Sequence, residues 1–66
     1  MIELILILET IDAKEHHIFP SSNSLEDYLA TINLCDYYYS NILFRIDNVL
    51  NYELTQLYKK MYLKKN

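Results

Sequence analysis

The first eleven residues, MIELILILETI (1–11), show the alternation of side chains that is typical of a β-strand. Because successive side chains of a strand point to opposite sides, the even-numbered residues 2–8 should share one face and the odd-numbered residues 3–9 the other. Both faces are apolar at the centre, since Ile5 and Ile7 stand opposite the leucines. We therefore expect both faces of this strand to be covered, one of them by a second subunit.

The same stretch is not expected to be a targeting or membrane segment. Glu3 and Glu9 interrupt its apolar run, which has no basic segment before it and no small-residue cleavage site after it. A membrane-spanning helix needs about 20 predominantly apolar residues, which this stretch does not provide.

The next segment predicts a second strand followed by a helix. Residues 12–14 should connect the first strand to the second, at residues 15–19, which ends at Pro20 because proline cannot donate to a strand ladder. Ser24 is the expected N-cap of the helix, with Glu26 and Asp27 in its first turn, where the helix dipole favours acidic residues. The helix should end near residues 33–36. Its apolar stripe of helical period consists of Leu25, Tyr28, Leu29 and Ile32.

The rest of the chain predicts one more strand and one more helix. Tyr37, Tyr38 and Tyr39 should lie in a connection, followed by a third strand at residues 42–49. Asn51 is the expected N-cap of a C-terminal helix over residues 51–65. The predicted fold is a single small α+β domain over residues 1–66, in the order ββαβα, with a three-stranded antiparallel sheet. The stripe of the last helix would consist of Leu54, Leu57, Tyr58, Met61 and Tyr62.

The small size of the chain predicts a homodimer. Sixty-six residues lie near the lower limit for a chain that folds alone. Cys35 is the only cysteine, so an internal disulfide is excluded, and it is expected to be a packed thiol in a reducing compartment.

Charge is strongly divided along the chain. Residues 1–53 carry all nine acidic residues and only two basic ones, Lys14 and Arg45, whereas residues 54–66 carry four lysines and no acid. An acidic body repels nucleic acid and attracts a protein with a cationic groove, such as an enzyme that holds DNA. The alternative is a solubilising surface without a partner. Direct binding of nucleic acid or of a membrane is not expected.

The residues favour no catalytic chemistry. The chain has no glycine, so phosphate-binding glycine loops and nucleophile elbows are excluded. His16 and His17 are neighbours on a strand and should point to opposite faces, one half-buried and one solvated, so they would not bind one metal ion together. We therefore expect neither enzyme activity nor a metal or cofactor.

Two segments carry a resemblance to a known family. LETIDAKEHHIFPSSNSLEDY (8–28) resembles a hairpin-then-helix unit that ends in an S-L-x-D-aromatic helix start, and RIDNVL (45–50) resembles a last strand of pattern R-L-D-x-V-L. Asp12 and Lys14 fall in register with that unit's turn. The family is that of the small, acidic, dimeric uracil-DNA glycosylase inhibitors of bacteriophages. The resemblance extends over about residues 4–50, with a short insertion where the tyrosines lie.

The resemblance implies inhibition by DNA mimicry in the cytoplasm of an infected bacterium. Carboxylates at the helix start would replace DNA phosphates, and an apolar pocket, completed by the dimer mate, would capture the leucine that the glycosylase inserts into DNA. Tyr28 stands where the family has a phenylalanine beside the pocket, and Asp27 matches an aspartate. Leu29 replaces a glutamate that contacts the enzyme, and Ile32 replaces a tyrosine. The expected partner-binding residues are Leu25, Glu26, Asp27, Tyr28, Leu29, Ile32 and Asp36, with Glu26 or Asp36 supplying the missing acidic role.

Other interpretations stay open at this point. The chain could be an acidic antagonist of another DNA-binding enzyme or defence nuclease, or a small dimeric interaction module. The apolar stripe of the first helix also fits plain core packing, and Glu26 and Asp27 also fit the ordinary electrostatics of a helix start.

Overall fold

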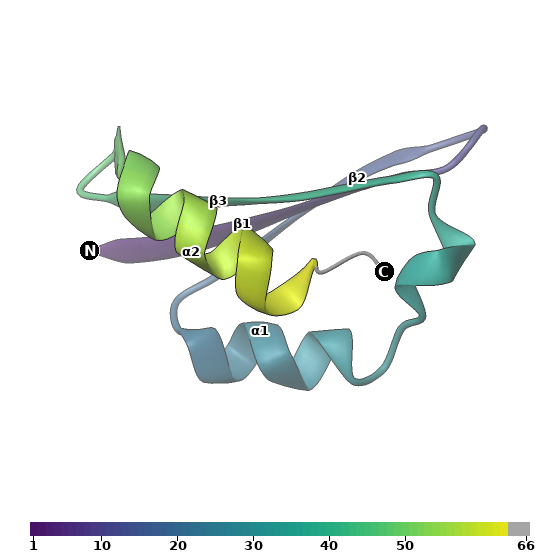
Figure 1. Ribbon diagram of the computed structural model, residues 1–66, viewed down its shortest axis with the longest axis horizontal. Coiled ribbons are helices and arrows are strands. Elements are labelled where there is room, and N and C mark those ends of the chain that lie inside the picture. The colour runs from purple at the N-terminus through teal and green to yellow at the C-terminus, as the bar shows by residue number, and fades with distance from the viewer. Residues whose placement is uncertain (64–66) are drawn as a thin grey trace.

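The computed structural model describes residues 1–63, and within them the chain forms a four-stranded sheet and two α-helices (Figure 1). The strands are β1 (Ile2–Glu9), β2 (Lys14–Phe19), β3 (Tyr39–Ile46) and β4 (Val49–Leu50). The helices are α1 (Ser22–Leu29), the short 3-10 helix η1 (Leu34–Asp36) and α2 (Tyr52–Tyr62). The α+β class is confirmed, with one short strand more than predicted.

The sheet is antiparallel throughout, in the order β2-β1-β3-β4. The apolar strand β1 lies in the middle, with Leu6 opposite His17 of β2 and Ile42 of β3. Residues 10–13 close the first hairpin without a glycine, because Thr10 bonds Ala13 through both its backbone and its side chain.

Both helices pack on the same face of the sheet. α1 lies beneath the strands, and α2 begins beside the edge of β3 and descends toward α1 (Figure 1). Each fully buried aliphatic side chain contributes about 1.5–3 kcal/mol relative to exposure, so this layer holds most of the apolar stabilisation. The buried core consists of Leu4, Leu6 and Leu8 of β1, Leu25 of α1, and Ile42 and Phe44 of β3.

The predicted start of α1 is wrong by three residues. Ser21 is the N-cap, and its Oγ accepts a hydrogen bond of 3.3 Å from the backbone N–H of Ser24. Ser24 therefore lies in the first turn, and Glu26 and Asp27 lie one turn further along, so the first turn contains no acid. The residue after Pro20 is the N-cap, and the helix begins at Ser22. With this start, Leu25 lies under the sheet in the core.

The third strand is also displaced from its prediction. β3 already begins at Tyr39, so only Tyr37 and Tyr38 of the three tyrosines belong to the connection, which contains η1. At its far end β3 turns sharply at Asp47 and Asn48, whose φ angles of 50° and 68° are both left-handed. A two-residue turn with positive φ at both positions matches the twist of an antiparallel pair, and β4 is the returning strand.

The C-terminal helix follows its prediction at the start. Asn51 is the N-cap, with its Oδ1 accepting from the N–H of Leu54 at 3.0 Å. The end predicted near residue 65 lies outside the described residues. Of the predicted stripe, Leu57 and Met61 are about half exposed, whereas Leu54, Tyr58 and Tyr62 pack against the core.

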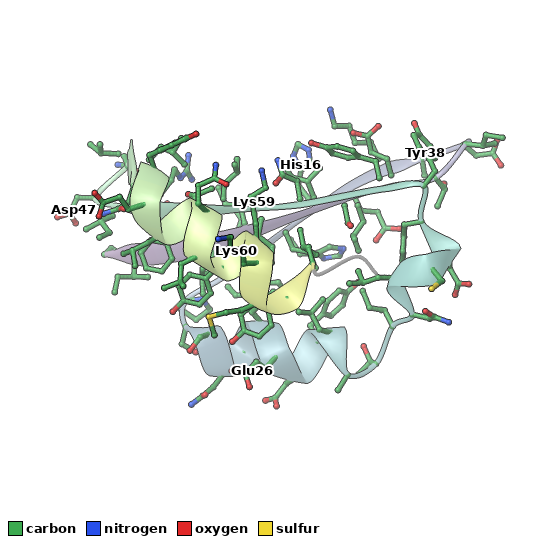
Figure 2. The ribbon with its side chains drawn as sticks, in the orientation of Figure 1. His16, Glu26, Tyr38, Asp47, Lys59 and Lys60 are labelled. Atoms are coloured by element: carbon green, nitrogen blue, oxygen red, sulfur yellow. The ribbon has the colours of Figure 1, made fainter. Side chains whose placement is uncertain are left out.

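The other face of the sheet is not covered by a helix within residues 1–63. This face, which we call the helix-free face, carries the odd-numbered residues of β1 and their cross-strand neighbours, and His16 of β2 points outward from it (Figure 2). We expected both faces to be covered. Within a single chain, the helices cover only one of them. Neither α1 nor α2 combines the length and apolar character that a membrane crossing requires.

Candidate partner-binding surface

The apolar stripe predicted on α1 serves mainly as interior of the protein. Leu25 is completely buried, so in this conformation it has no surface to offer a partner. Tyr28, Leu29 and Ile32 are half-buried and pack against the core. The core-packing interpretation therefore applies to all four residues, and only the last three retain exposed area.

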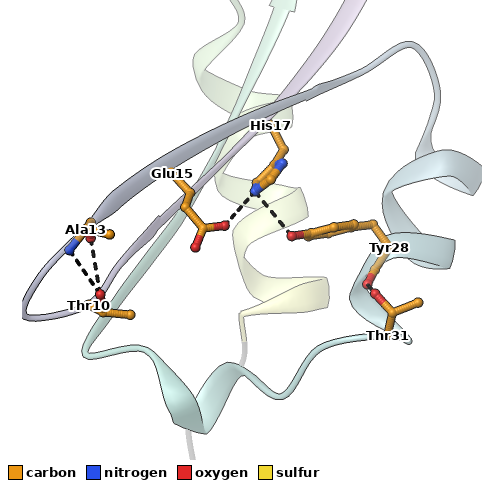
Figure 3. Close-up of polar contacts among 6 residues, drawn as sticks. All are labelled: Thr10, Ala13, Glu15, His17, Tyr28 and Thr31. Carbon is orange, nitrogen blue, oxygen red and sulfur yellow. Dashed lines mark hydrogen bonds and ion pairs between the residues drawn. The ribbon is translucent and has the colours of Figure 1, made fainter.

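Tyr28 is held by β2 through a short polar chain. Its hydroxyl lies 3.2 Å from Nε2 of His17, and the same nitrogen lies 2.9 Å from Oε1 of Glu15 (Figure 3). The Tyr28 ring also lies against His17 and Phe19, with centroid separations of 4.7 and 5.5 Å. When Nε2 carries the ring hydrogen, it can donate to the Glu15 carboxylate and to the Tyr28 hydroxyl together. His17 therefore fixes the orientation of α1 on the sheet. His17 is half-buried and His16 exposed, as predicted.

Glu26 is exposed but linked to the end of α2. Its Oε2 accepts a hydrogen bond of 2.8 Å from the hydroxyl of Tyr62. Burial, and then the bond to Glu26, raise the pKa of Tyr62 to about 12, so the phenol keeps its proton in alkaline solution where a free tyrosine loses it. This contact joins α1 to the end of α2.

The nine carboxylates fall into two groups. Glu3, Glu9 and Glu15 lie within 4 Å of Arg45, Lys14 and His17, and Asp47 pairs with the N-terminal ammonium. The other acids have no ion-pair partner within residues 1–63: Asp12, Glu26, Asp27, Asp36 and Glu53. Three of these five lie on α1 or η1, so the unneutralised negative charge is concentrated there.

Two tyrosines and the cysteine lie beside this acidic segment. The Tyr38 hydroxyl donates to Oε1 of Glu9 at 3.2 Å, and this bond is the largest cause of its raised pKa. Burial is the largest cause of the raised pKa of Tyr37, with Glu15 adding to it. Cys35 is exposed, so the expectation of a packed thiol is wrong. Asn33 caps η1 through the N–H of Cys35, and this cap leaves the thiol outside the core.

We define the acidic α1–η1 surface as Glu26, Asp27 and Asp36 with the exposed edges of Tyr28, Leu29 and Ile32. These sequence-predicted residues lie on α1, on the connection that follows it and on η1, and Leu25 is buried beneath α1. The sequence predicted that β1 is apolar on both faces, but the alternation does not show which face the helices cover and which they leave uncovered.

No match to this chain was found among protein-family models, curated proteins or solved structures. The functional argument therefore rests on the chain's own charges, contacts and sequence motifs.

Proposed function

We propose that this protein inhibits uracil-DNA glycosylase by imitating DNA. The observation that carries the proposal is the acidic α1–η1 surface, where three carboxylates stand without ion-pair partners among residues 1–63. An enzyme that holds DNA phosphates in a basic groove attracts such a surface through the same charges. The resemblance of residues 8–28 and 45–50 to the phage inhibitors selects the glycosylase among such enzymes.

The carboxylates have distinct parts in this proposal. Asp27 and Asp36 are exposed and free of described side-chain bonds, so they are available to replace phosphates. Glu26 offers one carboxylate oxygen, since the other accepts from Tyr62. Glu26 or Asp36 supplies the acidic role for which the family uses a glutamate at the position of Leu29.

The apolar part of the mimic is smaller than the resemblance implies. The glycosylase inserts a leucine into the DNA duplex, and an inhibitor captures that side chain on apolar surface. In this chain the half-buried Tyr28, Leu29 and Ile32 would receive it, with Leu25 supporting them from below. The charges therefore provide the larger share of recognition, and binding should weaken steeply as salt is added.

A binding experiment separates this proposal from the other acidic antagonists. The protein is mixed with a purified bacterial uracil-DNA glycosylase and passed over a size-exclusion column, with and without an excess of uracil-containing single-stranded DNA. We expect the protein to co-elute with the glycosylase and to exclude the DNA from that peak. A parallel mixture with a DNA nuclease of similar basic charge is the control. Equal co-elution with both enzymes would support a general acidic antagonist, and no co-elution with the glycosylase would contradict the proposal.

The biological setting follows from the target. An inhibitor of uracil excision would act in the cytoplasm of a bacterium infected by a phage, where the host glycosylase works on DNA. The homodimer expected from the small size of the chain does not depend on this target.

A further inference from the structure

The helix-free face has an apolar centre and charged ends. Its central residues on the three long strands are Ile5 and Ile7 of β1, Ile18 of β2 and Leu43 of β3. Ile18 is 58% exposed and Leu50 of β4, beside Arg45, is half exposed, whereas Ile7 and Leu43 are half-buried and Ile5 is only 9% exposed. An apolar sheet face of this kind on a soluble chain marks an interaction surface.

The charges on this face cancel within the chain. At one end Glu3 bonds Arg45, with Oε1 and Nη2 2.9 Å apart, and at the other end Glu9 lies 3.8 Å from Lys14. All four side chains belong to the helix-free face by register, so its strands carry no net charge. The remaining seven acids lie elsewhere, so this face is neutral although the chain as a whole is acidic.

A neutral face favours a second copy of this chain over a basic partner. Two copies with a net charge of −3 repel each other on most approaches, and the repulsion is least where the local charge is zero. A basic partner would instead be drawn to the acidic α1–η1 surface. We propose that two copies of the chain dimerise through their helix-free faces as a two-layered β-sandwich.

The order of residues on β1 and β3 is self-complementary under one two-fold axis. The axis runs parallel to the strands, midway between the two sheets and over the gap between β1 and β3. It places β1 of one copy opposite β3 of the other, so each β1 residue faces, in the second copy, the same β3 residue that it pairs with in its own sheet. The register then places Glu3 against Arg45, Ile5 against Leu43, Ile7 against Asn41, and Glu9 against Tyr39. Opposite charges meet at one end, two apolar side chains meet at the centre, and a carboxylate meets a phenol at the other end, whereas Ile7 meets an amide.

Arg45 has unused hydrogen-bonding capacity for this contact. Among residues 1–63 only its Nη2 bonds Glu3, and its side chain is about one-third exposed, whereas its Nε is buried and out of reach of a second copy. A guanidinium has five N–H donors in a fixed fork, so it can bind the glutamates of both copies.

The size of the face sets the strength of the dimer. Strands about 4.8 Å apart and about 3.4 Å per residue give the three long strands a footprint of roughly 300 Å² per copy. Side chains and Leu50 enlarge it, but it stays below the roughly 800 Å² per partner of a standard interface. We therefore expect a weak, concentration-dependent dimer, with the sheets packed about 10 Å apart.

This dimer leaves both acidic α1–η1 surfaces outward, on opposite sides. It differs from the arrangement that the resemblance implies, in which the dimer mate completes the leucine pocket. Each chain then binds a glycosylase on its own. The dimer itself does not depend on the proposed function, because it is formed by the protein alone.

Charge reversal tests the proposed pairing. Glu3→Arg and Arg45→Glu are prepared as separate variants, with folding checked by circular dichroism, and their masses are measured by sedimentation from about 1 µM to 1 mM. Each variant alone should sediment as a monomer where the parent is dimeric, since it places like charges opposite each other. An equal mixture of the two should recover the dimer, because opposite charges meet again only between chains.

Two further results decide the proposal. Ile7→Lys should abolish the dimer, whereas the same change at Ile11, which is 91% exposed at the hairpin tip, should leave it intact. If the parent protein stays monomeric at about 1 mM, the proposal that a second copy binds the helix-free face is wrong. A parent dimer whose charge-reversed variants fail to combine would overturn this arrangement of the two faces.

Discussion

Tyr62 of α2 and Glu26 of α1, 36 positions apart in the chain, are joined by a hydrogen bond of 2.8 Å. The Tyr62 ring also continues an aromatic row, since its centroid lies 5.8 Å from that of Tyr58, which lies 5.1 Å from that of Phe44. The row runs from the sheet along α2 to α1. The C-terminal helix thus ties the acidic α1–η1 surface to the core.

Removing the Tyr62 hydroxyl should change the alkaline stability of the protein. The folded pKa of about 12 lies above the ordinary 10, so the folded state holds the proton more tightly. This stabilisation is complete below pH 10 and is lost as the pH rises to about 12. We expect Tyr62→Phe to lower the free energy of unfolding by about 0.5–1.5 kcal/mol at neutral pH. Between pH 10 and 12, the free energy of unfolding should fall less in this variant than in the parent. Urea unfolding at several pH values measures both. Tyr37 and Tyr38 are common to both proteins, so parallel curves would contradict the assignment to Tyr62.

The hydroxyl of Thr55 closes the open edge of β3. It accepts from the backbone N–H of Phe44 at 2.9 Å, and Thr55 is only 3% exposed. Thr55→Val keeps the shape but leaves a buried N–H without an acceptor, which costs about 1–3 kcal/mol. Chemical denaturation should show this loss, and Thr55→Ser, which keeps the hydroxyl, should retain most of the stability. Equal stability of Thr55→Val and the parent would show that water or another group satisfies Phe44.

The turn between β3 and β4 offers a stabilising substitution. Asn48 has a φ of 68°, where a side chain is disfavoured and glycine is not. Asn48→Gly should therefore raise stability by about 0.5–1 kcal/mol, and Asn48→Ala should lower it by about 1 kcal/mol. Thermal unfolding of the two variants beside the parent measures the difference. The opposite order of the two variants would refute the left-handed turn.

The acidic α1–η1 surface should control the rate of glycosylase binding. Asp27→Asn with Asp36→Asn removes two charges that have no ion-pair partner among residues 1–63, so stability should stay within about 0.5 kcal/mol of the parent. The association rate should fall about tenfold at low salt and become less salt-dependent. Glu53→Gln on α2 is the matched control and should bind with parental kinetics. Stopped-flow or biosensor kinetics give these rates, and a double variant that binds like Glu53→Gln would place the surface elsewhere.

Local sequence signals predicted the strands β1 and β2 and the cap of α2. The alternation of side chains along a strand and the bond from the Asn51 side chain to the first turn of α2 both involve residues that are close in sequence. These signals failed at α1, where residues 21–24 are all good capping residues and the burial of Leu25 decides between them. They also failed to predict the turn at Asp47 and Asn48. Both residues adopt left-handed φ angles, although the glycine that usually indicates such a turn is missing. Of the site, its acidic residues were predictable, whereas the contact of Tyr62 with Glu26 depends on how α2 packs.

The uracil-release assay tests the proposed function most directly. A bacterial uracil-DNA glycosylase is titrated with the protein, and free uracil is measured from a uracil-containing duplex at low salt. The account predicts that release falls to zero at one chain per enzyme, and that the double change at Asp27 and Asp36 needs higher concentrations. Undiminished uracil release at a large excess of the folded protein would contradict it.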